Sequence, residues 1–266
     1  MGMIMGNKKR RTCRHQPMGL KILHEDREII VVDKSAGLLT IGTDKEKRRT
    51  AFYVLTDYVR KGCAKSRNRV FIVHRLDQDT SGVLIFAKTE EARTFLQENW
   101  ENTQKKYLAV VHGRLEKKED VITSYLTENS AHFVHSTSDR TKGRLSHTAY
   151  KVLKETREYS LLEIELLTGR KNQIRVHLAE MGHPVVGDWK YGKKDKVHKR
   201  LALHARSITF KHPSTGRTRT FEAGVPEYFE QLVGAFPSCP SCPAAIDTLA
   251  HLSQESSSND KTRRYV

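Results

Sequence analysis

Cysteine is scarce in this chain, with four residues among 266. A disulfide scaffold of this length would need more of them, so that class is excluded. Cys239 and Cys242 have the C-x-x-C spacing, but no second pair lies near them, and a closed zinc site needs four ligands. The histidines show neither H-x-x-x-H nor H-E-x-x-H spacing. We therefore predict no metal site.

Long apolar runs and glycine-rich nucleotide-binding motifs are also absent. No segment approaches the length that spans a bilayer, and no apolar stretch follows the basic N-terminus as it would in a secretion signal. Gly6 stands where a myristoylation signal carries a hydroxyl residue. We expect a cytoplasmic protein without membrane association, under reducing conditions and without a cofactor.

Acidic residues are few relative to basic ones, 31 against 47, which gives a formal net charge of +16. Such a surplus attracts polyanions, and nucleic acid is the commonest of these in a cell. The alternative is an ordinary solvated surface of a basic protein. The charge favours a nucleic-acid partner and a binding affinity that falls steeply with salt.

The basic residues are clustered in three places. The second cluster contains no acid and comes directly before the loop that begins at His74. This arrangement fits a surface that follows a phosphate backbone, although solvated loops would look the same. The clusters comprise Lys8, Lys9, Arg10, Arg11 and Arg14; Arg60, Lys61, Lys65, Arg67 and Arg69; and Lys190, Lys193, Lys194, Lys196, Lys199 and Arg200.

Composition divides the chain into three parts. Residues 1–18 are predicted to be a basic flexible arm, and residues 237–266, rich in serine, asparagine and charge, a flexible tail. The 19–236 segment between them is long enough for one folded domain with a substantial core.

Strand patterns dominate that domain, with a few helices and no regular βαβ alternation. This predicts an α+β fold with a mixed, largely antiparallel central sheet and flanking helices. Expected strands are Ile29–Val32, Val70–Val73, Val83–Ala87, Tyr107–Val111, Val121–Leu126, His147–Leu153, Leu161–Leu167, Leu201–Phe210 and Thr218–Ala223. Expected helices are Thr50–Val59, one capped by Thr89, Asn172–Met181 with Ile174, His177, Leu178 and Met181 on one side, and one opened by Pro226.

The loop His74–Gly82 joins two of these strands and carries the strongest functional signal. Asp77 follows the cation Arg75 by two residues, and Gly82 lets the chain turn into the next strand. A single aspartate in a polar loop is most often a turn former. The complete string His-Arg-Leu-Asp-Gln-Asp-Thr-Ser-Gly, however, resembles the catalytic motif of the RluA-type RNA pseudouridine synthases.

The resemblance extends over roughly Ile22 to Phe236, and the order and spacing of its five segments are more specific than any one of them. It implies the catalytic fold of that family, and the isomerisation of a flipped uridine to pseudouridine in RNA. The segments are Ile29–Leu38, His74–Gly82, Lys106–Gly113, Thr168–His177, and Leu201–Ala205 with Phe210–Pro213.

The resemblance also implies roles for single residues. Asp77 would act on the sugar, as nucleophile at C1′ or as base at C2′. Arg175 would pair with Asp77, although it could instead be a solvated helix residue off the Ile174 face. Tyr107 would stack on the target base and help remove the C5 proton; its alternative is a core residue at a strand end.

RNA contacts are implied at Arg75, His74, Arg170 and Lys171. Arg75 would fill the space that the flipped uridine leaves or hold its phosphate, and its alternative is a surface salt bridge. Ile174 and Leu203 could wall the base pocket or belong to the core. Asp79 stands at a position that the motif leaves variable, so we expect it to be dispensable.

Two positions depart from the family pattern. Ser35 stands where proline is usual, and Asn172 stands where many members carry histidine. Asparagine keeps a donor and an acceptor but cannot titrate, so we expect the change to be tolerated. Because the chain begins close to the catalytic domain, we expect no S4-type RNA-binding module of the kind seen in some relatives, and we expect the basic arm and the basic clusters to supply affinity instead.

The partner expected is therefore RNA, ribosomal or transfer, bound by a monomer that requires no protein partner. A noncatalytic RNA-binding protein on the same fold is the alternative. It would share the charge but would not need Asp77, Tyr107 and Arg175 together, so an enzyme is favoured.

Overall fold

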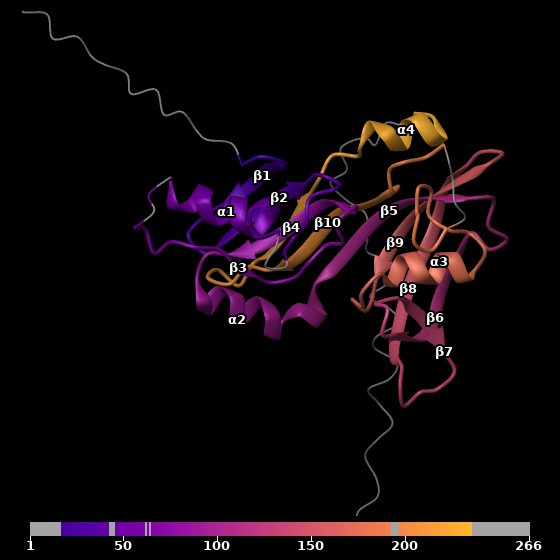
Figure 1. Ribbon diagram of the computed structural model, residues 1–266, viewed down its shortest axis with the longest axis horizontal. Helices are drawn as coiled ribbons and strands as arrows, with labels where there is room; N and C mark the ends of the chain where they lie inside the picture. Colours follow the sequence, from indigo (N-terminus) through magenta and orange to yellow (C-terminus); the bar gives the residue numbers. More distant parts are fainter. Residues whose placement is uncertain (1–16, 43–45, 62, 64, 193–196, 236–266) are drawn as a thin grey trace, which may run out of the picture. The chain divides into compact units, whose positions relative to one another are not determined.

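The computed structural model describes residues 17–42, 46–61, 63, 65–192 and 197–235 (Figure 1). Most of the arm predicted at 1–18 and all of the tail predicted at 237–266 lie outside the described residues, so the domain boundaries stay predictions. Lys193, Lys194 and Lys196 of the third basic cluster also lie outside them, as do Cys13, Cys239 and Cys242.

The strands of the described residues form one sheet. They are β1 (Leu20–Glu25), β2 (Ile29–Lys34), β3 (Phe71–Ile72), β4 (Ser81–Ala87), β5 (Gln104–His112), β6 (Glu119–Glu128), β7 (Val134–Thr137), β8 (Arg144–Glu155), β9 (Tyr159–Leu166), β10 (Leu203–Lys211) and β11 (Thr218–Glu222). Their order is β1-β2-β4-β10-β5-β9-β8-β6-β7, with β3 beside β4 and β11 beside β10. The pair β4–β10 is parallel and the other pairs are antiparallel. The predicted α+β class with a mixed, largely antiparallel sheet is confirmed.

Four α-helices of the described residues flank this sheet: α1 (Ala51–Arg60), α2 (Glu90–Glu98), α3 (Gln173–Glu180) and α4 (Glu227–Val233). Thr50 and Thr89 begin α1 and α2, because each side-chain oxygen accepts a hydrogen bond from the backbone N–H three residues on. All four helices correspond to predicted ones. Within the described residues, none of them has the length and apolar character that crossing a bilayer requires.

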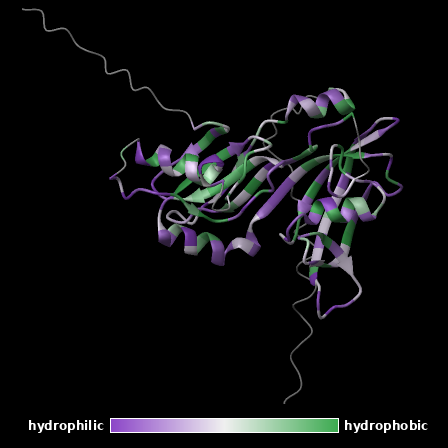
Figure 2. Cartoon of the chain, viewed as in Figure 1, coloured by the Kyte–Doolittle hydropathy of each residue, from purple (hydrophilic) through white to green (hydrophobic). Residues whose placement is uncertain are grey.

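One hydrophobic core cluster lies where β2 and β4 run side by side under α2. Ile29 and Val31 from β2 pack with Val83 and Ile85 from β4, and Leu96 of α2 closes over them. Alternate residues of these strands are buried on the other face as well, so both strands are almost continuously hydrophobic (Figure 2). Because both faces of these strands are buried, the sheet gives the loop at His74, which leads into β4, a firmly packed support.

Several local predictions need correction. Strands β1 and β7 were not predicted, because β1 mixes polar with apolar residues and β7 has only four residues. The strand expected at Val70–Val73 is reduced to β3. The helical side expected in α3 is wrong: Gln173 to Leu178 are all buried, while Met181 lies beyond the helix and is exposed. A helix buried all round has no single core-facing side.

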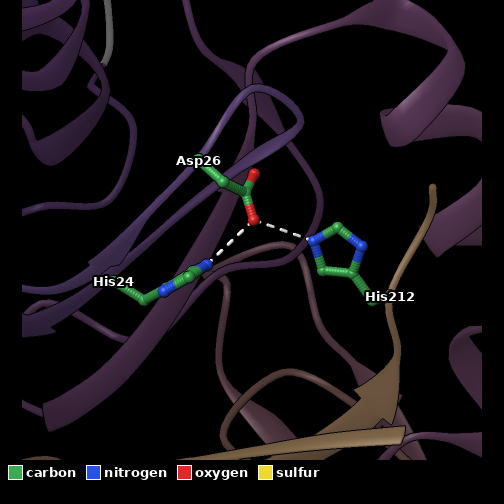
Figure 3. Close-up of side chains that lie close together, drawn as sticks. All are labelled: His24, Asp26 and His212. Atoms are coloured by element: carbon green, nitrogen blue, oxygen red, sulfur yellow. Dashed lines mark hydrogen bonds and ion pairs between the residues drawn. The ribbon is translucent and has the colours of Figure 1, made fainter. Parts of the chain in front are cut away.

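A polar clasp of His24, Asp26 and His212 joins the β1–β2 turn to the end of β10 (Figure 3). Both histidine Nε2 atoms lie 2.8 Å from Asp26 Oδ2, and Asp26 Oδ1 accepts from the backbone N–H groups of Glu28 and Ile29. Burial alone would raise the pKa of Asp26, but these hydrogen bonds together lower it well below its usual value. The clasp thus connects two hairpins that are far apart in the sequence.

Candidate active site

The loop between β3 and β4 is fastened to the segment that follows β2. The Thr40 hydroxyl donates to the Leu76 carbonyl at 2.8 Å and accepts from the Leu76 N–H at 3.2 Å. Gly37 N–H donates to the Gln78 carbonyl at 2.9 Å. The backbone on both sides of Asp77 is therefore held in place.

Lys34 also holds this loop in place, through a side chain that is fully buried. Its Nζ donates to the carbonyls of Ser35, Leu38 and Gln78 at 3.1, 2.8 and 2.9 Å, so all three ammonium protons are used. Burial lowers the pKa of Lys34 to about 8, although the nearby carboxylates of Asp79 and Asp77 oppose this effect. The sequence pattern contained Lys34 but gave no sign of this role.

Gly82 ends the loop with a φ of 111°, in the region that favours glycine. A Cβ at this position would overlap the backbone of Ala205, the β10 residue that pairs with it. The glycine thus permits the close parallel contact of β4 and β10. Beside it, Ser81 Oγ lies 2.9 Å from His204 Nδ1.

A cavity of about 280 Å³ opens at this loop. It lies close to the lower end of the range in which pockets hold small molecules. Asp77, Tyr107 and Arg175 all line it, as do the expected wall residues Ile174 and Leu203. The remaining lining residues are Val73, His74, Arg75, Leu76, Thr80, Trp100, Lys105, Leu166, Gly169, Arg170, Asn172 and Gln173.

The cation next to Asp77 is Arg175, whose Nη1 lies 3.6 Å from Asp77 Oδ2. The alternative interpretation of Arg175 as a solvated helix residue is wrong, because its exposed fraction is 9%. Its closest partner is a residue that the sequence did not single out. Arg175 Nε and Nη2 donate to the two oxygens of Asp188, both at 2.8 Å.

Asp188 is buried and accepts further hydrogen bonds from the backbone N–H groups of Lys190 and Tyr191, both at 3.0 Å. Burial would lower the pKa of the Arg175 guanidinium, but hydrogen bonds and charge from Asp188, with a contribution from Asp77, raise it. No periodicity marks a residue such as Asp188. Only the need of a buried arginine for a counter-charge could have pointed to it.

Asn172 completes this arrangement at the start of α3. Its φ of 54° is left-handed, a conformation that asparagine adopts more readily than most residues. Its Oδ1 accepts from Arg175 Nη1 at 3.3 Å, and its Nδ2 donates to the Tyr191 hydroxyl at 3.0 Å. The departure from histidine thus leaves a residue that uses both of its polar atoms.

Tyr107 lies on β5 with an exposed fraction of 9%. Burial, and after it the charge of Asp77, raises the pKa of its hydroxyl. The side chain is therefore a neutral phenol with its ring in the cavity wall. The ring of a neutral phenol can stack on a base without any change of charge. Its hydroxyl oxygen, however, can accept a proton only as its own proton leaves.

Three of the four expected RNA-contact residues, His74, Arg75 and Arg170, line the same cavity. His74 Nε2 accepts from the Ile85 N–H at 3.1 Å and its ring packs on Trp100 at 4.6 Å, so it presents only part of its surface to the cavity. Burial lowers the pKa of His74 to about 3, with a further contribution from Lys105. Arg75 and Arg170 are exposed cations at the rim.

A second cavity, of about 930 Å³, adjoins the first. Arg75, Asp77, Asn172 and Arg175 line both cavities, so Asp77 stands where the two meet. Lys171 lines the second one and forms an ion pair with Glu128. Of the described residues, the group that could offer three ligand atoms to a metal is the clasp at Asp26, which lines neither cavity.

The family model described as RNA pseudouridylate synthase matches residues 28–180, more than half of the chain. The chain belongs to this family. Its members isomerise uridine in RNA, so the chain is an RNA pseudouridine synthase, and the family expected from the sequence motifs is confirmed. The alternative of a noncatalytic RNA-binding protein is not favoured.

Individual relatives of this RNA pseudouridine synthase are named as pseudouridine synthases as well. It is 36% identical to a ribosomal large subunit pseudouridine synthase D from Nitrosomonas europaea, over 83% of this chain and 66% of that protein. It is 32% identical to a tRNA pseudouridine synthase C from Haemophilus influenzae, over 82% of this chain and 98% of that protein. The solved human RNA pseudouridylate synthase domain containing 1 superposes with a TM-score of 0.65 at 25% identity, covering 88% of this chain and 93% of that one.

Proposed function

We propose that Asp77 is the carboxylate that acts on the sugar of a uridine held in the first cavity. The observation that carries this assignment is the ion pair of Asp77 with the buried Arg175 at the point where both cavities meet. A guanidinium held by Asp188 keeps a fixed orientation and favours the negative charge of Asp77.

The reaction breaks the N-glycosidic bond, turns the free uracil and joins its C5 to C1′. Asp77 serves it either as nucleophile at C1′ or as base at C2′. The C5 proton that is lost is balanced by the proton that N1 gains, so no external acid, reductant or energy source is needed. This agrees with the expectation that no cofactor takes part.

Tyr107 supports the base in this proposal. Its ring forms part of the cavity wall, where it can stack on the uracil while the base turns. Because its pKa is raised, the hydroxyl takes up the C5 proton only as it passes its own proton on. Asp77, once released from the sugar, is an acceptor lining the same cavity.

Arg75, Arg170 and Lys171 would hold the phosphates around the extruded nucleotide. All three are exposed and lie at the rims of the two cavities. His74 would contribute a neutral ring to the pocket rather than a charge, because its pKa is low. Arg75, the nearest of these cations to Asp77 in sequence, would either hold the phosphate of the flipped uridine or fill the gap that this nucleotide leaves in the RNA.

Ribosomal or transfer RNA is the proposed substrate, bound by a monomer in the cytoplasm. The support is that relatives are named for both RNA classes, while this site reads a single flipped base. Pseudouridine mapping in cells lacking the gene, complemented with wild type or Asp77→Asn, tests both the class of RNA substrate and the assignment of Asp77. We expect specific sites to vanish and to return with wild type alone. Restoration by Asp77→Asn would refute the assignment of Asp77.

A further inference from the structure

The second cavity has the composition of a surface that binds single-stranded nucleic acid. Six of its lining side chains are basic and two are acidic. It continues directly from the cavity assigned to the uridine, through Arg75, Asp77, Asn172 and Arg175. A strand that places one nucleotide in the first cavity must therefore lead its neighbours past this basic surface.

Trp189 is the aromatic residue of this cavity, and 59% of its surface is exposed. Large aromatic side chains are more often buried, because exposure forfeits the hydrophobic gain of a large surface. Among the described residues, no ring or cation stacks on Trp189. More than half of this residue is therefore accessible, at a position where it lines the cavity.

The backbone that carries Trp189 is held firmly. Asp188 before it is buried and bonds both Arg175 and the N–H of Lys190. Lys190 after it donates from Nζ to the His132 carbonyl at 2.8 Å and lies over the ring of Tyr191. An exposed indole on a fixed backbone loses little conformational entropy when a base stacks on it.

Two further cations lie close to this segment. Gly187 has a φ of 74°, and a Cβ there would overlap the carbonyl of Arg200. The 187–189 and 199–201 segments thus pack backbone to backbone, and Lys199 and Arg200 line the same cavity as Trp189. Aromatic rings beside a cationic groove are the usual combination in proteins that bind single strands.

We propose that Trp189 is a stacking platform for an unpaired base next to the target uridine, with Lys199 and Arg200 binding the adjoining phosphates. This inference rests on the proposed function in one respect, namely that the uridine occupies the first cavity. Stacking accepts any base, so the platform selects unpaired RNA beside the target rather than a sequence. The enzyme would therefore favour uridines in loops or locally opened strands.

The chain allows a direct optical test, since Trp100 and Trp189 are its two tryptophans. In a Trp100→Phe protein, Trp189 is the single indole fluorophore. The probe is a short single-stranded RNA with one central uridine among adenosines. We expect this RNA to quench the fluorescence. An abasic nucleotide is then placed in turn on the 5′ and on the 3′ side of the uridine. At one of these two positions it should abolish most of the quenching, because the phosphate remains and the stacked base is lost.

Affinity gives a second measurement in the otherwise unchanged protein. Trp189→Ala should weaken binding of the RNA about five- to 150-fold, the range for loss of one stacked base, while Trp189→Phe should retain most of it. The RNA concentration at half-maximal rate should rise with Trp189→Ala, and the single-turnover rate at saturating RNA should not change. Circular dichroism checks that the variant is folded.

The two claims fail separately. Quenching and its loss with the abasic probe should persist in a protein that also carries Asp77→Asn, whatever that change does to catalysis. Full activity of Asp77→Asn would overturn the proposed function and leave the platform standing. Two results would overturn the platform and leave the catalytic assignment standing. One is wild-type RNA affinity of Trp189→Ala. The other is equal quenching by the unmodified RNA and by the two RNAs that carry an abasic nucleotide on either side of the uridine.

Discussion

Arg175 is bonded more closely to Asp188 than to Asp77. Its Nε and Nη2 lie 2.8 Å from the two Asp188 oxygens, while its Nη1 lies 3.6 Å from Asp77. Asp188 therefore compensates most of the buried positive charge and sets the plane of the guanidinium. The third nitrogen, Nη1, is shared between Asn172 Oδ1 at 3.3 Å and Asp77 Oδ2 at 3.6 Å.

Asp188→Asn should accordingly destabilise the protein and impair catalysis. Because a buried cation would lose its partner, the free energy of unfolding should fall by about 3–5 kcal/mol. Activity per folded molecule should also fall, because the guanidinium would no longer be fixed. Urea unfolding and single-turnover rates measure the two effects.

Asp120→Asn is the control for this change, since Asp120 forms an exposed ion pair with Lys117. Such a pair contributes at most about 1 kcal/mol, so this variant should behave nearly as wild type. An Asp188→Asn protein as stable as the control would show that Arg175 does not depend on Asp188.

Lys34 predicts an unusual dependence of stability on pH. Burial lowers its pKa to about 8, from an ordinary value of 10.5. Between these values the unfolded chain keeps a proton that the folded chain has lost, so the free energy of unfolding rises with pH. At 1.36 kcal/mol per pKa unit, the gain reaches about 3 kcal/mol.

Denaturant unfolding between pH 7 and about 10.5 checks this rise. Lys34→Met should lack it, whereas Lys151→Met, which removes an exposed lysine on β8, should retain it. The same rise in the wild type and in Lys34→Met would contradict the assignment of the effect to Lys34.

Asp26 should have the opposite dependence on pH. Its pKa is lowered in the folded protein, so its contribution is complete above the unfolded value of 3.8 and is lost as pH falls below it. Asp26→Asn should lower the free energy of unfolding at neutral pH by about 2 kcal/mol, because hydrogen bonds to a charged group are lost.

Unfolding of wild type and Asp26→Asn at a series of acidic pH values tests this. The difference between the two proteins should shrink as the pH falls below 3.8. A difference that stays constant down to the lowest pH would mean that the charge of Asp26 is not what stabilises the clasp with His24 and His212.

Much of the site could be predicted from the sequence because its chemistry lies in contiguous strings. Asp77, Tyr107 and Arg175 were each named from such a string, and the structure places all three around one cavity. The sheet class followed from strand patterns in the same way. These features are local, and local patterns are what a sequence displays directly.

Asp188, Lys34 and Trp189 show what the sequence could not reveal. The importance of Asp188 arises from a partner 13 positions away, and that of Lys34 from the Gln78 carbonyl 44 positions away. A tryptophan such as Trp189 would be assigned to the core from its residue type alone, yet it is exposed. Their roles depend on tertiary contacts between segments, which no periodicity encodes.

Tyr107→Phe should separate stacking from proton transfer. The ring remains, so RNA affinity should stay within about threefold of wild type, while loss of a proton-transfer group should slow single turnover about 10²- to 10⁴-fold. Filter binding and product formation at saturating RNA measure the two quantities. A normal rate would leave Tyr107 with a stacking role only.

The most direct test of the account compares Asp77→Asn with Asp79→Asn, two changes of the same type in one loop. Asp77 lines both cavities and faces Arg175, whereas Asp79 is exposed and lines only the second. Tritium release from RNA labelled at uridine C5 would be measured at single turnover, per folded and RNA-bound molecule. The account predicts no detectable release from Asp77→Asn and a rate within about threefold of wild type from Asp79→Asn. Release by Asp77→Asn within about tenfold of wild type would contradict it.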